Sequence, residues 1–298
     1  MALDSQRFGL SCAITTPMGR DGAVDLRRLV DHARHVLANG CDSITLFGTT
    51  GEGASLGATE RNAMLGAVAG AGLDPSRQLH VGIAASSLEE AVAQARAAAE
   101  IGAKGLLLAP PFYFKGLSEE GLYAWFSRFF ETLGTAARHT ILYHIPSVTA
   151  VELSVALVGR LKQAFPGIVA GVKDSSCHYP TTEAFLKAHG ELAILVGDER
   201  LLARAVRAGA QGSICGVANL VPQLLRPLVY QGSEDGTVTA LVDEICRYPV
   251  VPAVKALAGH IHGDDGFGPM RAPLVALDAE QRKTLFAAFD RIVRAKAA

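Results

Sequence analysis

Short runs of apolar residues alternate with longer amphipathic segments along most of the chain. Alanine- and leucine-rich stretches such as 24–39, 88–101 and 118–133 predict helices, and several of them are followed by glycine, a common residue just after a helix C-terminus. The alternation of strands with helices implies that the strands pair in parallel. The apolar runs have the length and composition of buried strands and lie at 9–14, 43–47, 79–83, 105–109, 140–143, 168–173, 193–196 and 211–215.

Eight strand–helix units of this kind predict an α/β fold, a (β/α)8 TIM barrel. An open doubly wound sheet would usually have fewer strands and a glycine-rich dinucleotide loop after the first one, and the segment TTPM at 15–18 is no such loop. Beyond residue 217 the pattern becomes all-helical. We therefore expect a catalytic barrel over residues 1–216 and a C-terminal helical extension over 217–298, packed on the barrel as one structural unit.

Composition and charge mainly exclude classes of protein, such as nucleic-acid-binding and membrane proteins. The chain has 298 residues, of which 49% are hydrophobic and 19% charged, as suits elements buried on both faces. A net charge of -1 gives no global attraction for nucleic acid or for an anionic membrane. The N-terminus MALDSQRFGL lacks the apolar stretch of a secretory signal, and the five cysteines form no C-x-x-C pair. We expect a cytoplasmic protein with no nucleic-acid or membrane partner.

Candidate chemistry lies where strands end, because the active sites of such barrels are built at the carboxyl ends of the strands. Lys173 follows five apolar or glycine residues at the end of the sixth predicted strand. A lysine there can simply extend its ammonium group into water while its stem covers apolar surface. Alternatively, burial can keep the amine neutral enough to attack a carbonyl and form a Schiff base. The residues alone leave both interpretations open.

Hydroxyl groups end other strands. In GTTGEG at 48–53, closely spaced glycines can form a backbone anion site beside Thr49 and Thr50, which suits a carboxylate. Tyr113 follows the fourth predicted strand and Tyr143 ends the fifth. Each tyrosine either packs as an aromatic side chain or transfers protons near a Schiff base through its phenol. The histidines are dispersed over separate elements, so we expect no metal site.

Three motifs in this order resemble one known family. They are GTTGE at 48–52, Tyr143-x-x-Pro146 and GVKD at 171–174, and the likeness continues through VKA at 254–256 and RAPL at 271–274. The sequence is similar to the dihydrodipicolinate synthase and N-acetylneuraminate lyase superfamily of pyruvate-dependent class I aldolases. The resemblance implies a TIM barrel, a homotetramer built as a dimer of dimers, and no cofactor besides a covalent imine on Lys173.

The resemblance also implies residue roles. Lys173 would form the imine with pyruvate or another 2-oxo acid, and Tyr143 would act as general acid and base beside it. Thr49 and Thr50 would bind the pyruvate carboxylate, with Thr49 also relaying a proton. Tyr113 would reach into the neighbouring subunit's site.

Four further positions bear on the substrate. Ile214 matches the position whose backbone carbonyl faces the lysine. Dihydrodipicolinate synthases carry an arginine for the second carboxylate of their aldehyde where this chain has Val148. Gly197, Asp198 and Glu199 match residues that hold substrate hydroxyls in sialic acid lyases, although Asp198 can also be a simple helix cap.

We therefore expect a class I aldolase that cleaves, or forms, a 2-keto-3-deoxy sugar acid, with pyruvate and an aldehyde as the products of cleavage. Two alternatives within the enzyme class are 4-hydroxy-tetrahydrodipicolinate synthase, which condenses pyruvate with aspartate semialdehyde, and a 2-keto-3-deoxy acid dehydratase. A non-enzymatic alternative is a 2-oxo acid sensor. A sensor would be expected to have lost its nucleophile or relay, whereas Lys173, Tyr143, Tyr113 and Thr49 are all present.

Overall fold

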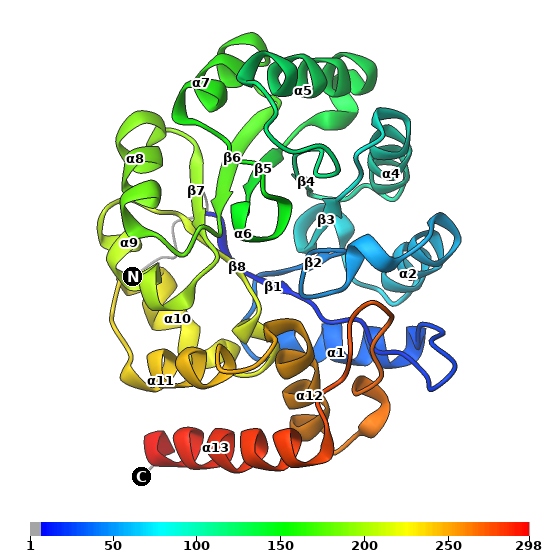
Figure 1. Ribbon diagram of the computed structural model, residues 1–298, viewed down its shortest axis with the longest axis vertical. Coiled ribbons are helices and arrows are strands. Elements are labelled where there is room, and N and C mark those ends of the chain that lie inside the picture. The colour runs from blue at the N-terminus through cyan, green and yellow to red at the C-terminus, as the bar shows by residue number, and fades with distance from the viewer. Residues whose placement is uncertain (1–6, 298) are drawn as a thin grey trace.

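Eight parallel strands close into a barrel in the order β1 to β8 in the computed structural model, which describes residues 7–297 (Figure 1). All eight predicted strands are confirmed, and their ends agree with the expected ranges to within one residue. The strands are β1 (Gly9–Ala13), β2 (Ser43–Leu46), β3 (Leu79–Ile83), β4 (Gly105–Leu108), β5 (Thr140–His144), β6 (Val169–Asp174), β7 (Ala193–Val196) and β8 (Gly212–Cys215).

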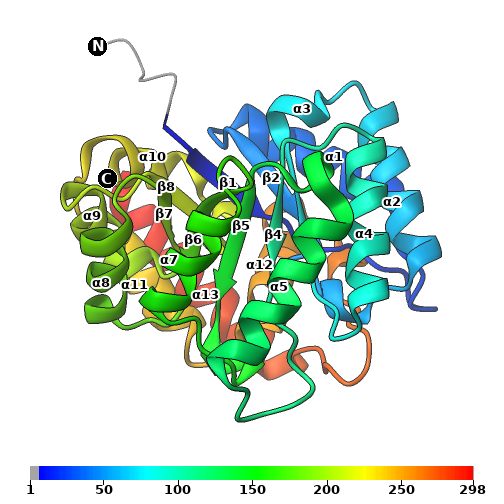
Figure 2. The same cartoon turned by 90° about the horizontal axis from the view of Figure 1, so that it is seen from above.

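Helices surround the barrel on its outside, and Figure 2 shows two of them, α5 and α7, in front of the strands. Several begin at a side-chain cap; for example, Ser87 and Ser118 each accept a hydrogen bond from a backbone N–H in the first turn. The barrel helices are α1 (Leu26–Ala38), α2 (Ala58–Gly70), α4 (Leu88–Glu100), α5 (Glu119–Leu133), α7 (Val155–Ala164), α8 (Tyr179–His189), α9 (Glu199–Arg207) and α10 (Pro222–Gln231), with short helices α3 (Pro75–Gln78) and α6 (Pro146–Thr149) in the connections.

The segment after residue 216 is helical, as predicted: α10 is followed by α11 (Gly236–Ile245), α12 (Val250–His262) and α13 (Ala279–Ala297). Helix α13 packs on α11 and α12, and the three lie together beside the barrel in Figure 1. Helix α10 packs against α9 and β1, the position of the barrel helix after β8. The division of the chain at residue 216 stays a prediction.

The alternation of side chains along β6 decides which residues face the inside of the barrel. Val172 packs in the apolar cluster between strands and helices, and Asp174 accepts hydrogen bonds from Thr182 and from the backbone N–H of Ser176. Lys173 takes the opposite face and lines a cavity at the barrel mouth. The register pairs Lys173 with Tyr143 of β5, so the two lie side by side.

The expectation about a secretory signal rests on residues 1–10, and of these 1–6 lie outside the described residues. Within 7–297, no helix combines the length and the hydrophobicity needed to cross a bilayer.

Candidate active site

Lys173 lies at the carboxyl end of β6 with only 4% of its surface exposed. It lines a cavity of about 390 Å³ formed by the ends of the strands together with α9, α11 and α12. Its Nζ lies 4.2 Å from the centre of the Tyr143 ring. The structure therefore places this lysine inside a cavity large enough for a small substrate, rather than extended into solvent.

Tyr143 connects Lys173 to the loop after β2. Its hydroxyl lies 3.3 Å from Thr49 Oγ1 in a hydrogen bond. Burial raises the pKa of the Tyr143 phenol, but the charge of Lys173 and hydrogen bonding with Thr49 and Ser175 outweigh this effect, so the pKa is lowered overall. A lowered pKa makes Tyr143 more suitable as a base at moderate pH.

The loop that carries Thr49 and Thr50 is tightly folded. Phe47 and Glu52 both adopt positive φ, at 60° and 56°. A Cβ at Gly53 would lie 2.0 Å from the Phe47 carbonyl oxygen, and one at Gly51 would lie 2.6 Å from the Ile14 carbonyl oxygen. Glycine is required at both positions because the backbone of one segment passes directly against another. The loop is thereby held at the cavity wall.

Two residues of the C-terminal extension, Lys255 and Arg271, bind this loop through Glu52. Lys255 Nζ lies 2.5 Å from Glu52 Oε1, and both side chains are fully buried. The backbone N–H of Arg271 donates to the other oxygen of Glu52, and its guanidinium group donates to the Ser55 carbonyl and to Glu60. The resemblance had pointed to the segments that contain Lys255 and Arg271, but their partners were not predicted.

Gly197, Asp198 and Glu199 follow β7 and line the same cavity. A Cβ at Gly197 would lie 2.1 Å from Ser175 Oγ, so glycine leaves room for that hydroxyl. Asp198 caps α9 and binds Arg200 through both carboxylate oxygens. Glu199 accepts a hydrogen bond from the Val217 N–H at 2.9 Å, and burial raises its pKa. Their role in holding substrate hydroxyls stays a prediction, and Asp198 has the cap role as well.

The remaining predicted residues lie at different depths. Ile214 is fully buried in β8 and lines the cavity, whereas Val148 is 60% exposed at the mouth. Tyr113 is 74% exposed, and its backbone N–H donates to Ser86 Oγ. It does not line the cavity around Lys173, so its proposed contact with a neighbouring subunit stays a prediction.

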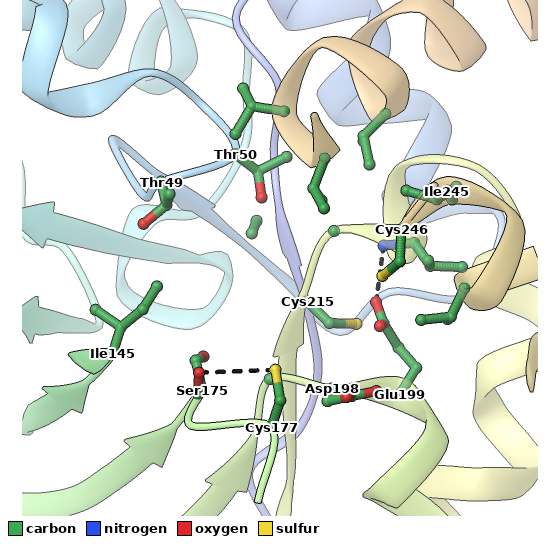
Figure 3. Close-up of a pocket in the computed structure, with 18 of the residues that line it drawn as sticks. Thr49, Thr50, Ile145, Ser175, Cys177, Asp198, Glu199, Cys215, Ile245 and Cys246 are labelled. Carbon is green, nitrogen blue, oxygen red and sulfur yellow. Dashed lines mark hydrogen bonds between the residues drawn. The ribbon is translucent and has the colours of Figure 1, made fainter. Parts of the chain in front are cut away.

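Several cavity residues were not predicted from the sequence. Figure 3 shows Thr49 and Thr50 on one side and, across the cavity, Ser175, Cys177 and residues of the α9 and α11 region. Ser175 directly follows the GVKD motif and could have been found from that position. Ile245 and Cys246 could not, because they lie in the extension, far along the sequence.

A second cavity of about 480 Å³ shares Thr49, Tyr143 and Val148 with the first one. Its wall is mainly apolar and includes Phe47 and Phe112. Thr49 and Tyr143 thus lie between two spaces, one on the side of Lys173 and one on the side of the loop after β4. Among residues 7–297, no group of three or more histidine, cysteine or acidic side chains could hold a metal ion.

Comparison with known proteins identifies relatives over nearly the whole chain. Residues 6–292 match the dihydrodipicolinate synthetase family. A 4-hydroxy-tetrahydrodipicolinate synthase of Streptomyces coelicolor is 33% identical, covering 97% of this chain and 95% of the relative. An uncharacterized DapA-like lyase of Chloroflexus aurantiacus is 31% identical, covering 96% of this chain and 97% of the relative. The crystal structure of a dihydrodipicolinate synthase from Agrobacterium tumefaciens has 52% identity and a TM-score of 0.94, covering 96% and 99% of the two chains.

The fold and the site, together with these relatives, define a TIM-barrel enzyme of the lyase and aldolase class. The chain belongs to the dihydrodipicolinate synthetase family. The resemblance drawn from the three sequence motifs is thereby confirmed.

Proposed function

We propose that the protein is a pyruvate-dependent lyase that forms an imine on Lys173 and cleaves a 2-keto-3-deoxy sugar acid to pyruvate and an aldehyde. One observation carries this proposal: a buried lysine lies against a tyrosine whose hydroxyl is bonded to Thr49. Lys173 is the nucleophile as the amine. The positive charge that lowers the pKa of the Tyr143 phenol is carried again by the protonated imine, at the stage when Tyr143 acts as the proton acceptor.

The chemistry follows from that pair. The Lys173 amine adds to the C2 ketone, and loss of water leaves a protonated imine. Tyr143, as phenolate, takes the proton of the C4 hydroxyl; the C3–C4 bond breaks, the aldehyde leaves, and the electron pair enters the imine to give an enamine. Protonation at C3 and hydrolysis then release pyruvate and restore the lysine. Thr49 relays the proton because its hydroxyl is bonded to Tyr143.

The identity of the aldehyde is inferred from the charges around the cavity. Val148 provides no positive charge where a synthase of this family would place arginine. Arg200 also lines the cavity, but its guanidinium group is bound to Asp198 and to Asp243. An aldehyde without a second carboxylate therefore fits better than aspartate semialdehyde, which would lose a charge-assisted hydrogen bond.

A second candidate is 4-hydroxy-tetrahydrodipicolinate synthase. The names of the relatives from Streptomyces and Agrobacterium favour it, and the same imine would serve. A 2-keto-3-deoxy acid dehydratase shares the imine but expels a hydroxyl group. Assays of aldehyde release, water loss and condensation with aspartate semialdehyde, run side by side, distinguish the three reactions. We also propose a cytoplasmic homotetramer in which Tyr113 contacts a neighbouring subunit.

Borohydride reduction in the presence of pyruvate tests the imine. We expect a covalent adduct on the intact protein, mapped by peptide mass spectrometry to Lys173, and no adduct in Lys173→Ala. Lys173→Ala should also lose turnover while remaining a folded oligomer. An adduct on Lys104, Lys115 or Lys255 instead, or an active Lys173→Ala variant, would disprove the mechanism. No adduct with any 2-oxo acid, together with tight pyruvate binding, would favour a sensor.

A further inference from the structure

A third cavity, of about 720 Å³, lies at the opposite end of the barrel from Lys173. It is formed where strands begin, and its lining includes His80 of β3, Ile141 of β5 and Ala193 of β7. Three alanines, Ala103, Ala170 and Ala193, are among the residues that line it. None of the residues that line it lines either cavity at the mouth.

The lining of this lower cavity is positively charged. Within residues 7–297, neither Arg7 nor Lys104 forms a salt bridge; Arg7 donates to the Val229 carbonyl, and Lys104 Nζ lies 5.7 Å from the centre of the Phe8 ring. Glu191 is the acidic residue of the lining, and its carboxylate is paired with Lys162. Among the described residues the lining therefore has two cations outside any salt bridge and one carboxylate that is already paired, an excess of positive charge. Asp42, which lies outside the lining, also attracts Lys104.

A buried polar group in the same lining lacks a partner. His80 is 3% exposed, and its Nδ1 has no hydrogen-bond partner among the described residues. Its ring packs against that of Phe8 at a tilt of 38°, with the ring centres 4.9 Å apart. Burial lowers the pKa of His80 to about 3, with smaller contributions from Lys104 and His139, so the imidazole is neutral at physiological pH. A neutral imidazole donates through one ring nitrogen and accepts through the other, and leaving the buried Nδ1 unbonded is costly in either role.

We propose that this lower cavity binds a small oxyanion, carried as a phosphate or a carboxylate group. Arg7 and Lys104 supply the charge, and the His80 imidazole, in the tautomer with its proton on Nδ1, donates to the anion a hydrogen bond that it otherwise lacks. A metal cation is disfavoured by the same two charges, and a purely apolar ligand would leave the imidazole unsatisfied. The site is separate from the chemistry at Lys173, and its occupation should stabilise the barrel through mass action.

Isothermal titration calorimetry with inorganic phosphate and, separately, with malonate tests the site at constant ionic strength. We expect saturable binding of at least one anion, and the tighter of the two identifies the class of ligand. Lys104→Met and His80→Phe should each weaken binding about tenfold or more, because each removes a hydrogen bond or a charge. Lys283→Met, an exposed change on α13, is the matched control and should bind like the wild type.

A second measurement localises the anion without any substitution. Phosphate should slow chemical acetylation of Lys104, followed by peptide mass spectrometry, and leave Lys283 unaffected. Lys173→Ala should retain anion binding, since the proposal does not depend on the imine. No saturable binding of either anion, an unchanged affinity in Lys104→Met, or loss of binding in Lys173→Ala would overturn the proposal.

Discussion

Lys255 of α12 and Glu52 of the loop after β2 form a fully buried ion pair, with Nζ and Oε1 2.5 Å apart. The pair joins the C-terminal extension to the loop that carries Thr49 and Thr50. Burial lowers the pKa of Lys255, and the hydrogen bond to Glu52 opposes this effect. The pair therefore holds the loop of Thr49 and Thr50 in a backbone conformation that Glu52, at φ 56°, would not adopt readily by itself.

Removing one partner of this pair should be costly. We expect Lys255→Met to lower the free energy of unfolding by about 3–5 kcal/mol, because it leaves the Glu52 carboxylate buried without its counter-charge. The activity of the remaining folded enzyme should also fall, since Thr49 is displaced. Urea unfolding and steady-state kinetics at one protein concentration measure both effects. The double variant Glu52→Gln/Lys255→Met should recover part of the lost stability; equal losses in the single and double variants would contradict the role of the pair.

The hydrogen bond between Thr49 and Tyr143 should control the pH dependence of cleavage. In the proposed mechanism the phenolate is the active base, so the rate should rise with pH through the pKa of Tyr143, which lies below its ordinary value. Thr49→Val removes a hydrogen bond that favours the phenolate and should move this rise to higher pH. Rate profiles and ultraviolet titration of tyrosinate measure the shift.

Thr50→Val is the matched control for that experiment, because no hydrogen bond joins Thr50 to Tyr143 among the described residues. Its tyrosinate titration should follow the wild type. If Thr49→Val and Thr50→Val titrate alike, the hydrogen bond does not set the pKa of Tyr143.

Val148 should determine whether a second carboxylate is accepted. It is exposed at the mouth of the cavity, so a longer side chain can be accommodated without repacking the core. We expect Val148→Arg to raise kcat/KM for condensation of pyruvate with aspartate semialdehyde about tenfold or more, through a charge-assisted hydrogen bond. Val148→Met controls for side-chain length. A wild-type enzyme that already condenses aspartate semialdehyde efficiently, with no gain from arginine, would favour the synthase.

Two buried histidines should make the protein sensitive to acid. Burial lowers the pKa of both His32 and His80 from 6.5 to about 3. Between these values the unfolded chain binds protons that the folded chain does not, so stability should fall as the pH drops from about 6.5 towards 3. Each histidine contributes at most about 1.4 kcal/mol per pH unit.

Urea unfolding over this pH range measures that loss. His80→Phe should be less steeply dependent on pH than the wild type, because one titrating group is gone. His178→Gln, at an exposed position, should leave the slope unchanged. Identical slopes for all three proteins would show that burial of His80 does not contribute to acid sensitivity.

Much of the architecture could be read from local patterns. The apolar runs and the helical segments between them predicted the eight strands and the barrel, because burial on both faces leaves a signal within each strand. The position of Lys173 at the barrel mouth was predicted because it lies at the carboxyl end of a recognisable strand, β6. The motifs around Thr49 and Tyr143 indicated the family. The sequence pattern was sufficient to place a residue wherever its position within its own strand or helix decides whether it is buried.

Other features were decided only when the barrel closed. Glu52 and Lys255 lie 203 positions apart, and neither residue's neighbours in the sequence show that the two form a buried pair. Closure likewise brings Cys246 of the extension to the cavity wall. The lower cavity also depends on closure, because Arg7 lies before β1 and Lys104 lies before β4. Such contacts depend on how distant elements pack. The hydrophobic periodicity of a segment shows which of its faces is buried, but it does not show which other segment packs on that face.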